Sequence, residues 1–279
     1  MKLDKANQRI FVRQSWLNDA VTCAERSRLG MVKPEMRTGS DATIMGTAVH
    51  YAIELVLTGT IAPHEMEDAA IAQFKELKAT EQWQPTNIDA DKYEVYIRSM
   101  CQSFLDGIFP EVELGGTCEM RFQYPMGFTA YDWAIWAEGT MDYVSPSGVV
   151  WDWKTASRAY NAKEKQSQSI QASVYAGAVH HLGMSDLPVD FRYGVMIRQE
   201  KPRSQIVRLS RGSSHLRWLE HTIKPVLSTG LLVGVDNSWP MNDSSNLCSS
   251  RWCSYWSICK GAFLTDQDLS PVTVPVVIS

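Results

Sequence analysis

The feature that most constrains this chain is the stretch "VVWDWKTA" at residues 149–156. Its valines and tryptophans make it apolar on both faces of a strand, and such a strand is normally buried between two layers. The same stretch carries Asp152 and Lys154. Removing an unpaired charge from water costs free energy. The sequence therefore predicts that these two charges find partners inside the protein.

A second carboxylate precedes this strand across a tight turn. Asp142 lies in "EGTMDYV", and the turn "SPSG" at residues 145–148 leads to the strand of Asp152, which predicts a hairpin. Cross-strand neighbours approach to about 5 Å at their Cβ atoms, where two carboxylates repel each other or share a cation. Lys154 points to the same face as Asp152. A divalent metal between the carboxylates, with a lysine beside it, would cleave phosphodiesters. The alternative is an ordinary Asp–Lys pair on a surface hairpin.

The rest of the chain alternates between helical and strand patterns. Its 279 residues with 44% hydrophobic content suit one large domain or two small ones. The pattern predicts an α/β fold, in which a mixed central β-sheet with an antiparallel meander is flanked by helices. The predicted helices are 6–30, 46–57, 64–82, 88–109, 163–183 and 214–230. The predicted strands are 117–126, 129–146, 148–156, 189–199 and 204–210, and residues 270–279 are predicted to form an edge strand or a draped segment.

Charge and hydropathy exclude some classes of protein. The formal net charge is −4, so overall charge does not indicate nucleic-acid binding, although Arg and Lys gather near residues 26–37 and 192–211. Such local patches suit a phosphate-binding groove or an ordinary solvated face. The start "MKLDKANQRI" is no signal peptide, and no apolar run is long enough to span a membrane. We therefore expect a cytoplasmic protein with no membrane contact.

A histidine follows a small-residue pair in "GTAVH". His50 is predicted to lie near the first turn of its helix, after Gly46 and Thr47. A single histidine on an apolar helix is usually a core residue. The metal site predicted elsewhere in the chain favours the interpretation of His50 as a metal ligand. Glu54 lies four residues on and shares that face of the helix. It either orients His50 or is solvated.

Three cysteines lie together near the C-terminus. Cys248, Cys253 and Cys259 have the spacing C-x4-C-x5-C, and a reducing compartment argues against a disulfide framework. A four-thiolate site needs a fourth ligand, for which Cys23 is the candidate. Zinc and free buried thiols are the alternatives. We expect Cys101 and Cys118 to be core residues.

These motifs together resemble the PD-(D/E)XK nuclease superfamily, specifically its RecB-like exonuclease branch. "GTAVH", "MDYV", "VVWDWKTA" and "QSIQASVYA" occur in the family's order between residues 46 and 176. The resemblance implies a Mg²⁺ or Mn²⁺ site with the ligands His50, Asp142, Asp152 and the backbone carbonyl of Trp153. It also implies that Lys154, Gln171 and Tyr175 are catalytic residues, with Gln171 and Tyr175 contacting the DNA backbone or orienting Lys154. A polar stripe on an amphipathic helix is the alternative for Gln171 and Tyr175.

The cysteine pattern resembles an iron–sulfur subgroup of the same nucleases, which includes the CRISPR-adaptation exonucleases and the nuclease domain of AddB. There, one N-terminal and three C-terminal cysteines hold a [4Fe–4S] cluster, which implies Cys23, Cys248, Cys253 and Cys259 as ligands here. The first C-terminal pair of the subgroup is usually separated by two residues, whereas four separate Cys248 from Cys253.

The resemblance implies a single nuclease domain over residues 1–279. It has a restriction-endonuclease-like core and a helical insertion at about 58–114. A cluster-binding segment at 246–262 would close onto the N-terminal helix. The function implied is a metal-dependent DNA exonuclease in recombination, repair or CRISPR-type DNA processing. Its partners would be DNA and other recombination or CRISPR-adaptation proteins. The alternatives are an endonuclease of the same fold, or a non-catalytic DNA-binding or adaptation-complex subunit.

Overall fold

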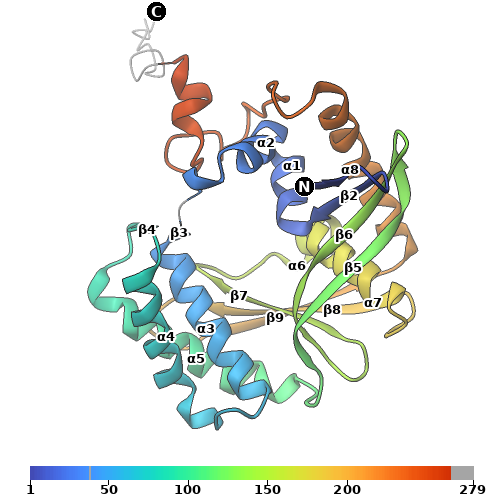
Figure 1. The fold of residues 1–279 in the computed structure, drawn as a ribbon. Coiled ribbons are helices and arrows are strands. Elements are labelled where there is room, and N and C mark those ends of the chain that lie inside the picture. The colour runs from blue at the N-terminus through green and yellow to red at the C-terminus, as the bar shows by residue number, and fades with distance from the viewer. Residues whose placement is uncertain (38, 265–279) are drawn as a thin grey trace, which may run out of the picture.

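The computed structural model describes residues 1–37 and 39–264, and it has a central β-sheet with helices on both faces (Figure 1). The helices are α1 (Gln14–Thr22), α2 (Ala24–Val32), α3 (Asp41–Leu57), α4 (Met66–Thr80), α5 (Tyr93–Gly107), α6 (Ala162–Gln168), α7 (Ile170–His181) and α8 (Ser213–Val233). The strands are β1 (Lys2–Asp4), β2 (Arg9–Arg13), β3 (Gly39–Ser40), β4 (Trp83–Gln84), β5 (Thr117–Ala130), β6 (Trp133–Val144), β7 (Val150–Ala156), β8 (Val189–Ile197) and β9 (Ser204–Arg211).

Seven of these strands form one mixed sheet. Its order is β1-β2-β6-β7-β8-β9, and β5 pairs with β6. The strands β5, β6 and β7 make an antiparallel meander, β8 runs parallel to β7, and β9 runs antiparallel to β8. Strands β3 and β4 form a separate parallel pair. The predicted fold class, a mixed α/β sheet with a meander and flanking helices, is confirmed.

Strand β6 is the branch point of the sheet. Its edge opposite β5 pairs with β2 over residues 134–138 and with β7 at residues 143–144. Between these two pairings, residues 139–142 have no strand on that edge within the described chain. Their backbone groups need other hydrogen-bond partners wherever they are buried. The candidate site described below lies at this opening.

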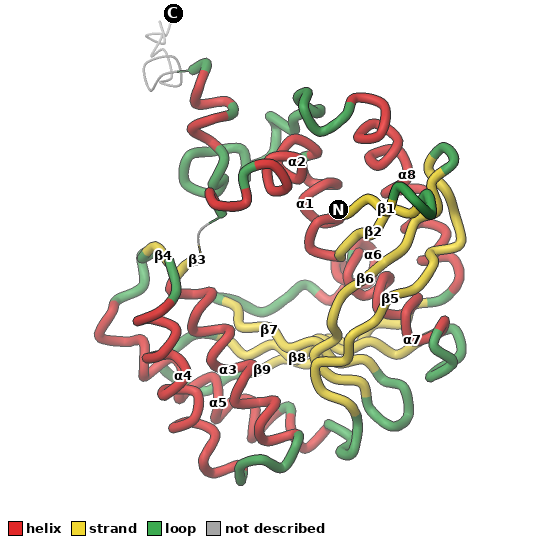
Figure 2. Tube along the Cα trace, viewed as in Figure 1, coloured by secondary structure: helices red, strands yellow, loops and turns green. Residues whose placement is uncertain are grey.

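Helices lie against both faces of the sheet (Figure 2). They bury two hydrophobic cores, one on each face. One core joins the sheet to α1, α7 and α8, and it includes Val150. The other core joins it to α3, α4 and α5, and it includes Trp151 and Trp153. Because side chains alternate along a strand, Asp152 and Lys154 share the face of Val150 and point toward α7. The prediction that this strand is buried on both faces is confirmed for residues 150–153, whereas residues 154–156 are half-buried.

The predicted single helix at residues 6–30 is wrong. Residues 9–13 form β2, where the buried side chains of Ile10 and Val12 alternate in the period of a strand and pair with β6. The helix after it is interrupted at Cys23, which has an extended backbone with φ −159° and ψ 110°. This interruption separates α1 from α2 and places a cysteine between them.

Two further boundaries differ because side chains of serine cap helices. Ser40 accepts a hydrogen bond from the backbone N–H of Thr43, so α3 begins at Asp41, and His50 lies in about the third turn instead of the first. Ser169 accepts from the N–H of Ala172 and starts α7, which splits the predicted helix 163–183 in two.

The predicted strand 129–146 contains a turn at residues 131–132 that separates β5 from β6. The predicted helices 64–82 and 88–109 are confirmed as α4 and α5, and the predicted helix 214–230 as α8, which continues through Pro225. The strands predicted at 189–199 and 204–210 are confirmed as β8 and β9. The edge strand or draped segment predicted at 270–279 lies outside the described residues. Within the described ranges, no helix is both long and apolar enough to cross a membrane.

Candidate active site

Asp152 is the most buried charged group of the site. It lies in β7 with 1% of its side chain exposed, and its Oδ1 accepts a hydrogen bond of 2.7 Å from Gln171 Nε2. Its Oδ2 lies 2.5 Å from Lys154 Nζ as an ion pair, but receives no hydrogen bond of normal geometry from the described residues. Lys154 is therefore the charged partner of this buried oxygen.

Asp142 approaches Asp152 from the neighbouring strand, as the hairpin predicted. The pairing of Tyr143 with Trp151 places Asp142 opposite Asp152 one step further along. Asp142 Oδ2 accepts a 2.7 Å hydrogen bond from the backbone N–H of Trp153. This bond lies at the opening of the sheet, where a ladder partner is missing. It fixes the carboxylate beside β7.

His50 reaches the same carboxylate from α3. Its Nδ1 is 3.7 Å from Asp142 Oδ2, and 31% of the side chain is exposed. Gly46 makes this approach possible, because a Cβ at that position would lie 2.7 Å from Thr155 Oγ1 of β7. The glycine of "GTAVH" therefore allows the helix to pack closely enough against β7 for His50 to face the hairpin.

Burial and mutual repulsion perturb the acids. Burial is the main cause that raises the pKa of Asp152 to about 6, with repulsion from Asp142 adding to it and attraction to Lys154 opposing it. Burial likewise raises the pKa of Asp142 above its usual range. Two carboxylates that repel each other on facing strands are stabilised by positive charge between them. Lys154 supplies such a charge in the structure, and a divalent ion would supply more.

The basic groups respond in opposite directions. Burial lowers the pKa of His50 to about 4, and the nearby Lys154 ammonium adds to that effect, so the imidazole is neutral near pH 7. Burial also disfavours the charged form of Lys154, but its attraction to Asp152 and Asp142 outweighs this and raises its pKa above the usual value. A neutral imidazole is a competent metal ligand. A charged lysine is suited to holding negative charge.

Gln171 and Tyr175 form one hydrogen-bonded unit with the hairpin. They lie one turn apart on α7, and Gln171 Nε2 bonds Asp152. The hydroxyl of Tyr175 donates a 2.8 Å hydrogen bond to the carbonyl of Thr140, in the part of β6 that lacks a strand on that edge. The helix therefore holds one carboxylate of the site and satisfies the opening in the sheet beside it. Both side chains are buried.

Sequence reasoning missed Tyr193. The parallel pairing of β7 with β8 places it directly beside Asp152. Its hydroxyl lies 2.6 Å from Ser169 Oγ and 3.5 Å from Gln171 Oε1, and Lys154 Nζ lies 6.0 Å from its ring centre. The only signal available was the alternation of "VDFRYGV". Which of its residues would face Asp152 depends on a register that the sequence does not encode locally.

Sequence reasoning also missed Glu119. The register of β5 against β6 brings it opposite Asp142. Glu119 is exposed, but partial loss of hydration beside β6 is the main cause that raises its pKa to about 7, with repulsion from Asp142 and Glu54 adding to it. Its backbone has a φ of 46°, which interrupts the strand pattern locally.

The donors fit a hard divalent cation in kind. Two carboxylates, a neutral imidazole and the carbonyl of Trp153 match Mn²⁺ well and Mg²⁺ in part. The Oδ2 of Asp152, which is paired with Lys154 but receives no hydrogen bond of normal geometry, also fits such an ion if the ammonium moves away. As they stand, however, no three His, Cys, Asp or Glu side chains of residues 1–37 and 39–264 converge closely enough to hold one. The ammonium of Lys154 takes the position against Asp152 Oδ2.

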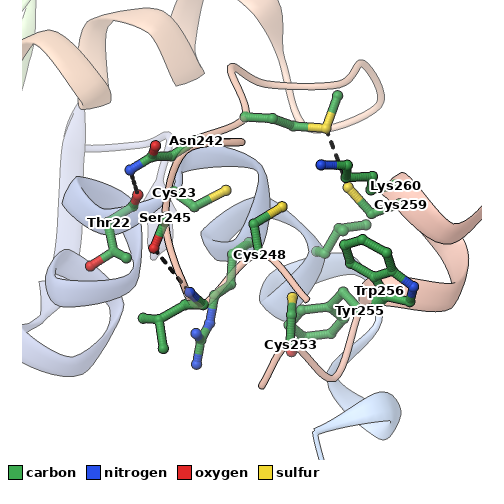
Figure 3. Close-up of a pocket in the computed structure, with 14 residues that line it drawn as sticks. Thr22, Cys23, Asn242, Ser245, Cys248, Cys253, Tyr255, Trp256, Cys259 and Lys260 are labelled. Atoms are coloured by element: carbon green, nitrogen blue, oxygen red, sulfur yellow. Dashed lines mark hydrogen bonds between the residues drawn. The ribbon is translucent and has the colours of Figure 1, made fainter. Parts of the chain in front are cut away.

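The four predicted cluster cysteines line one pocket (Figure 3). Cys23 comes from the break between α1 and α2, and Cys248, Cys253 and Cys259 come from the C-terminal segment. All are free thiols, as are Cys101, which is buried in α5, and Cys118 of β5. Asn242 Nδ2 donates to the carbonyl of Thr22 at 2.8 Å and ties the two parts of the chain together beside the pocket.

The comparisons with known proteins agree with this geometry. The sequence model described as the PD-(D/E)XK nuclease superfamily matches residues 17–260. The chain therefore belongs to the PD-(D/E)XK nuclease superfamily, and the family supports a nuclease enzyme that acts on DNA. Nucleases of this superfamily typically use divalent metals such as Mg²⁺. No curated protein matches the chain at a significant level.

Two solved structures are similar to this one. A crystal structure from Eubacterium rectale, named "Putative exonuclease", has a TM-score of 0.55 and 12% identity, covering 89% of this chain and 92% of its own. This likeness shows the fold. The protein SSO0001 has 14% identity and covers 95% of this chain and 90% of its own. Its TM-score of 0.45 is too low to argue from.

The link between α7 and the opening in β6 gives a first prediction. Tyr175→Phe removes the hydroxyl that satisfies the Thr140 carbonyl, so we expect the free energy of unfolding in urea to fall by about 1 kcal/mol. The control is Tyr131→Phe, in the β5–β6 turn with 58% exposure, for which we expect a change within about 0.5 kcal/mol. Equal stability of the two variants would contradict this role of Tyr175.

Proposed function

We propose that this protein is a metal-dependent DNA exonuclease of the RecB-like branch. The observation that carries the proposal is the buried Asp152 carboxylate, which has Asp142 and Lys154 beside it and one oxygen without a hydrogen bond of normal geometry. In the alternative, an ordinary Asp–Lys ion pair on a surface hairpin, the carboxylate would be exposed to water. The Asp152 side chain is only 1% exposed. Family membership supports the nuclease class, and this site supports metal dependence.

Each residue of the site has a proposed role. Asp142, Asp152, His50 and the carbonyl of Trp153 hold a Mg²⁺ or Mn²⁺ ion. When bound, the ion supplies activation of water and neutralisation of the scissile phosphate. Lys154 turns from Asp152 toward the phosphate and stabilises its negative charge.

The residues of α7 act on the carboxylates and not on the DNA in this proposal. Gln171 keeps Asp152 oriented through its 2.7 Å hydrogen bond. Tyr175 fixes the segment of β6 that carries Asp142 through its bond to Thr140. Both would then be positioning residues, whose loss affects the geometry of the site before it affects DNA binding.

Exonuclease action, its context and the extent of the domain are also proposals. They rest on the order of the RecB-like motifs and on the name carried by the similarly folded protein of Eubacterium rectale. We propose one nuclease domain with an insertion at about 58–114 that contains α4 and α5. We further propose a cytoplasmic role in recombination, repair or CRISPR-type DNA processing, with DNA and proteins of those systems as partners.

A cleavage assay tests this function on two substrates. With Mg²⁺ or Mn²⁺, the wild-type protein should degrade end-labelled linear DNA and leave covalently closed circular DNA intact. Asp152→Ala and excess chelator should each abolish degradation. Cleavage of the closed circle would indicate an endonuclease of the same fold, and absence of cleavage on both substrates would favour a non-catalytic DNA-binding subunit.

Lys154 is expected to affect chemistry more than binding. Lys154→Ala should reduce the cleavage rate by about 10²- to 10⁴-fold at saturating DNA, because it removes charge stabilisation at the phosphate. Lys75→Ala on α4, an exposed lysine paired with Glu94, is the matched control and should cleave normally. A Lys154→Ala rate within about threefold of wild type would remove Lys154 from the mechanism.

We also propose that Cys23, Cys248, Cys253 and Cys259 hold a [4Fe–4S] cluster. The supporting observation is that thiols from the two ends of the chain line one pocket, which Tyr255 and Trp256 also line. As they stand, the described side chains do not converge there closely enough to hold a metal ion, so ligation of either a cluster or zinc requires the thiols to draw together.

The cluster gives a further prediction. Cys253→Ser and Cys23→Ser should lose the brown colour, iron and sulfide of protein purified without oxygen, and should lower the melting temperature, because the ligated metal closes a very long loop. Cys118→Ser, outside the pocket, should keep all three properties. Colourless protein with one equivalent of zinc would establish the zinc alternative, and colourless, metal-free and equally stable protein would establish free thiols.

A further inference from the structure

The loop that follows β7 is held in place by β9. This loop, residues 157–161, connects β7 to α6. The backbone N–H of Tyr160 donates to Gln205 Oε1 at 2.8 Å, and Gln205 Nε2 donates back to the Tyr160 carbonyl at 3.1 Å. The side chain of a neighbouring strand thus takes both backbone groups of one loop residue. The backbone of Tyr160 is therefore held by hydrogen bonds that do not involve its aromatic ring.

Helix α6 is fastened to the same strand. Arg211 of β9 is buried and donates to the carbonyls of Lys165 and Gln166 at 2.6 and 2.5 Å. The side chain of Gln166 also pairs with the backbone of Ser210 through bonds of 3.1 and 3.2 Å. A buried guanidinium used this way rigidifies the end of a short helix. Residues 157–168 therefore form a preorganised surface.

This surface presents an aromatic ring and a cation together. The ring of Tyr160 meets Tyr193 edge to face, with centroids 5.7 Å apart and planes at 79°. Lys165 Nζ lies 4.6 Å from the centre of the Tyr160 ring. Tyr193 in turn lies beside Asp152 in the sheet. The Tyr160 ring therefore contacts Tyr193, the neighbour of the proposed catalytic residue Asp152 in the sheet.

Tyr160 lines two pockets. One, of about 330 Å³, is lined by Lys154, Gln171, Tyr193 and the C-terminal half of α1. The other, of about 610 Å³, lies along the loop and adds Arg158. Tyr160, Glu164 and Lys165 line both pockets. Volumes of about 300–1,000 Å³ are those of small-molecule sites.

The charges of these pockets favour an anion. Their cationic lining residues are Lys154, Lys165 and Arg158, and their anionic lining residue is Glu164. Lysine and arginine beside an aromatic ring match a nucleotide, whose phosphate takes the cations and whose base stacks on the ring.

We propose that Tyr160, Lys165 and Arg158 form a binding subsite for one unpaired nucleotide of the DNA, next to the catalytic carboxylates. The inference rests on the proposed nuclease function and adds the residues that hold the strand. The base displaces the Lys165 ammonium from the Tyr160 ring and stacks there, and Lys165 and Arg158 bind the phosphate of that nucleotide. Because base faces in a duplex are covered by their neighbours, this subsite takes a single strand and discriminates against paired DNA.

Binding without cleavage tests the subsite. The probe is a fluorescein-labelled oligothymidine, alone or annealed to its complement, titrated by fluorescence anisotropy in chelator. Wild type should bind the single strand more tightly than the duplex. Tyr160→Ala should weaken single-strand binding about 5- to 100-fold, which is the loss expected for one stacked base. Tyr160→Phe, which keeps an aromatic ring, should bind the single strand as tightly as the wild type does. The backbone bonds to Gln205 remain in both variants.

Lys165 has a separate signature. Lys165→Gln should reduce the slope of log affinity against log salt by about 0.7, the value for one phosphate contact on a single strand, whereas Tyr160→Ala should leave that slope unchanged. The matched controls are Trp218→Ala and Lys224→Gln on α8, both exposed and outside these pockets. They should bind as wild type does.

The outcomes separate this inference from the proposed function. Equal affinity of Tyr160→Ala and Trp218→Ala for the single strand, or duplex binding as tight as single-strand binding, would overturn the subsite even if the wild type cleaves DNA. Conversely, a wild type that binds in the Tyr160-dependent manner but cleaves no substrate with Mg²⁺ or Mn²⁺ would support the subsite and refute the nuclease proposal.

Discussion

The burial of Asp152 in a strand that is apolar on both faces is the constraint on which the site depends. A carboxylate in such a place is unstable without compensation, and breaking its pairing would leave an uncompensated buried charge. Two elements supply partners: α7 gives Gln171, and β7 itself gives Lys154. Tyr193 of β8 lies beside Asp152 in the sheet, and its hydroxyl contacts Ser169 and Gln171.

The opening in β6 is the second half of the same arrangement. Strands β2 and β7 pair with the same edge of β6, and residues 139–142 between these pairings have no strand on that edge within the described chain. Their backbone groups and side chains can therefore form hydrogen bonds with residues of the site. Asp142 uses its carboxylate to accept the Trp153 N–H, and Tyr175 takes the Thr140 carbonyl. An uninterrupted ladder would have left less room for a metal between the two strands. In Figure 1, β6 runs beside β2 and then beside β7.

The hairpin was predictable because its information is local. Alternation, the turn "SPSG" and the offset of two residues between Asp152 and Lys154 were sufficient to place both carboxylates together, and the registers agree. The contacts of His50, Gln171 and Tyr193 were not predictable to the same degree. They depend on where Ser40 and Ser169 begin their helices and on the register of β8, which packing over long sequence separations decides. The single helix predicted for residues 6–30 failed for a related reason, since pairing with β6 outweighed helical preference.

In the proposed function, Asp142 and Asp152 hold a metal ion in place of the Lys154 ammonium. Diffraction from crystals grown with Mn²⁺, measured at a wavelength where manganese scatters anomalously, would locate that ion. We expect an anomalous peak between the two carboxylates, with His50 in contact and Lys154 Nζ displaced from Asp152 Oδ2. No peak at saturating Mn²⁺, or a peak elsewhere with the Asp152–Lys154 ion pair intact, would refute the metal site.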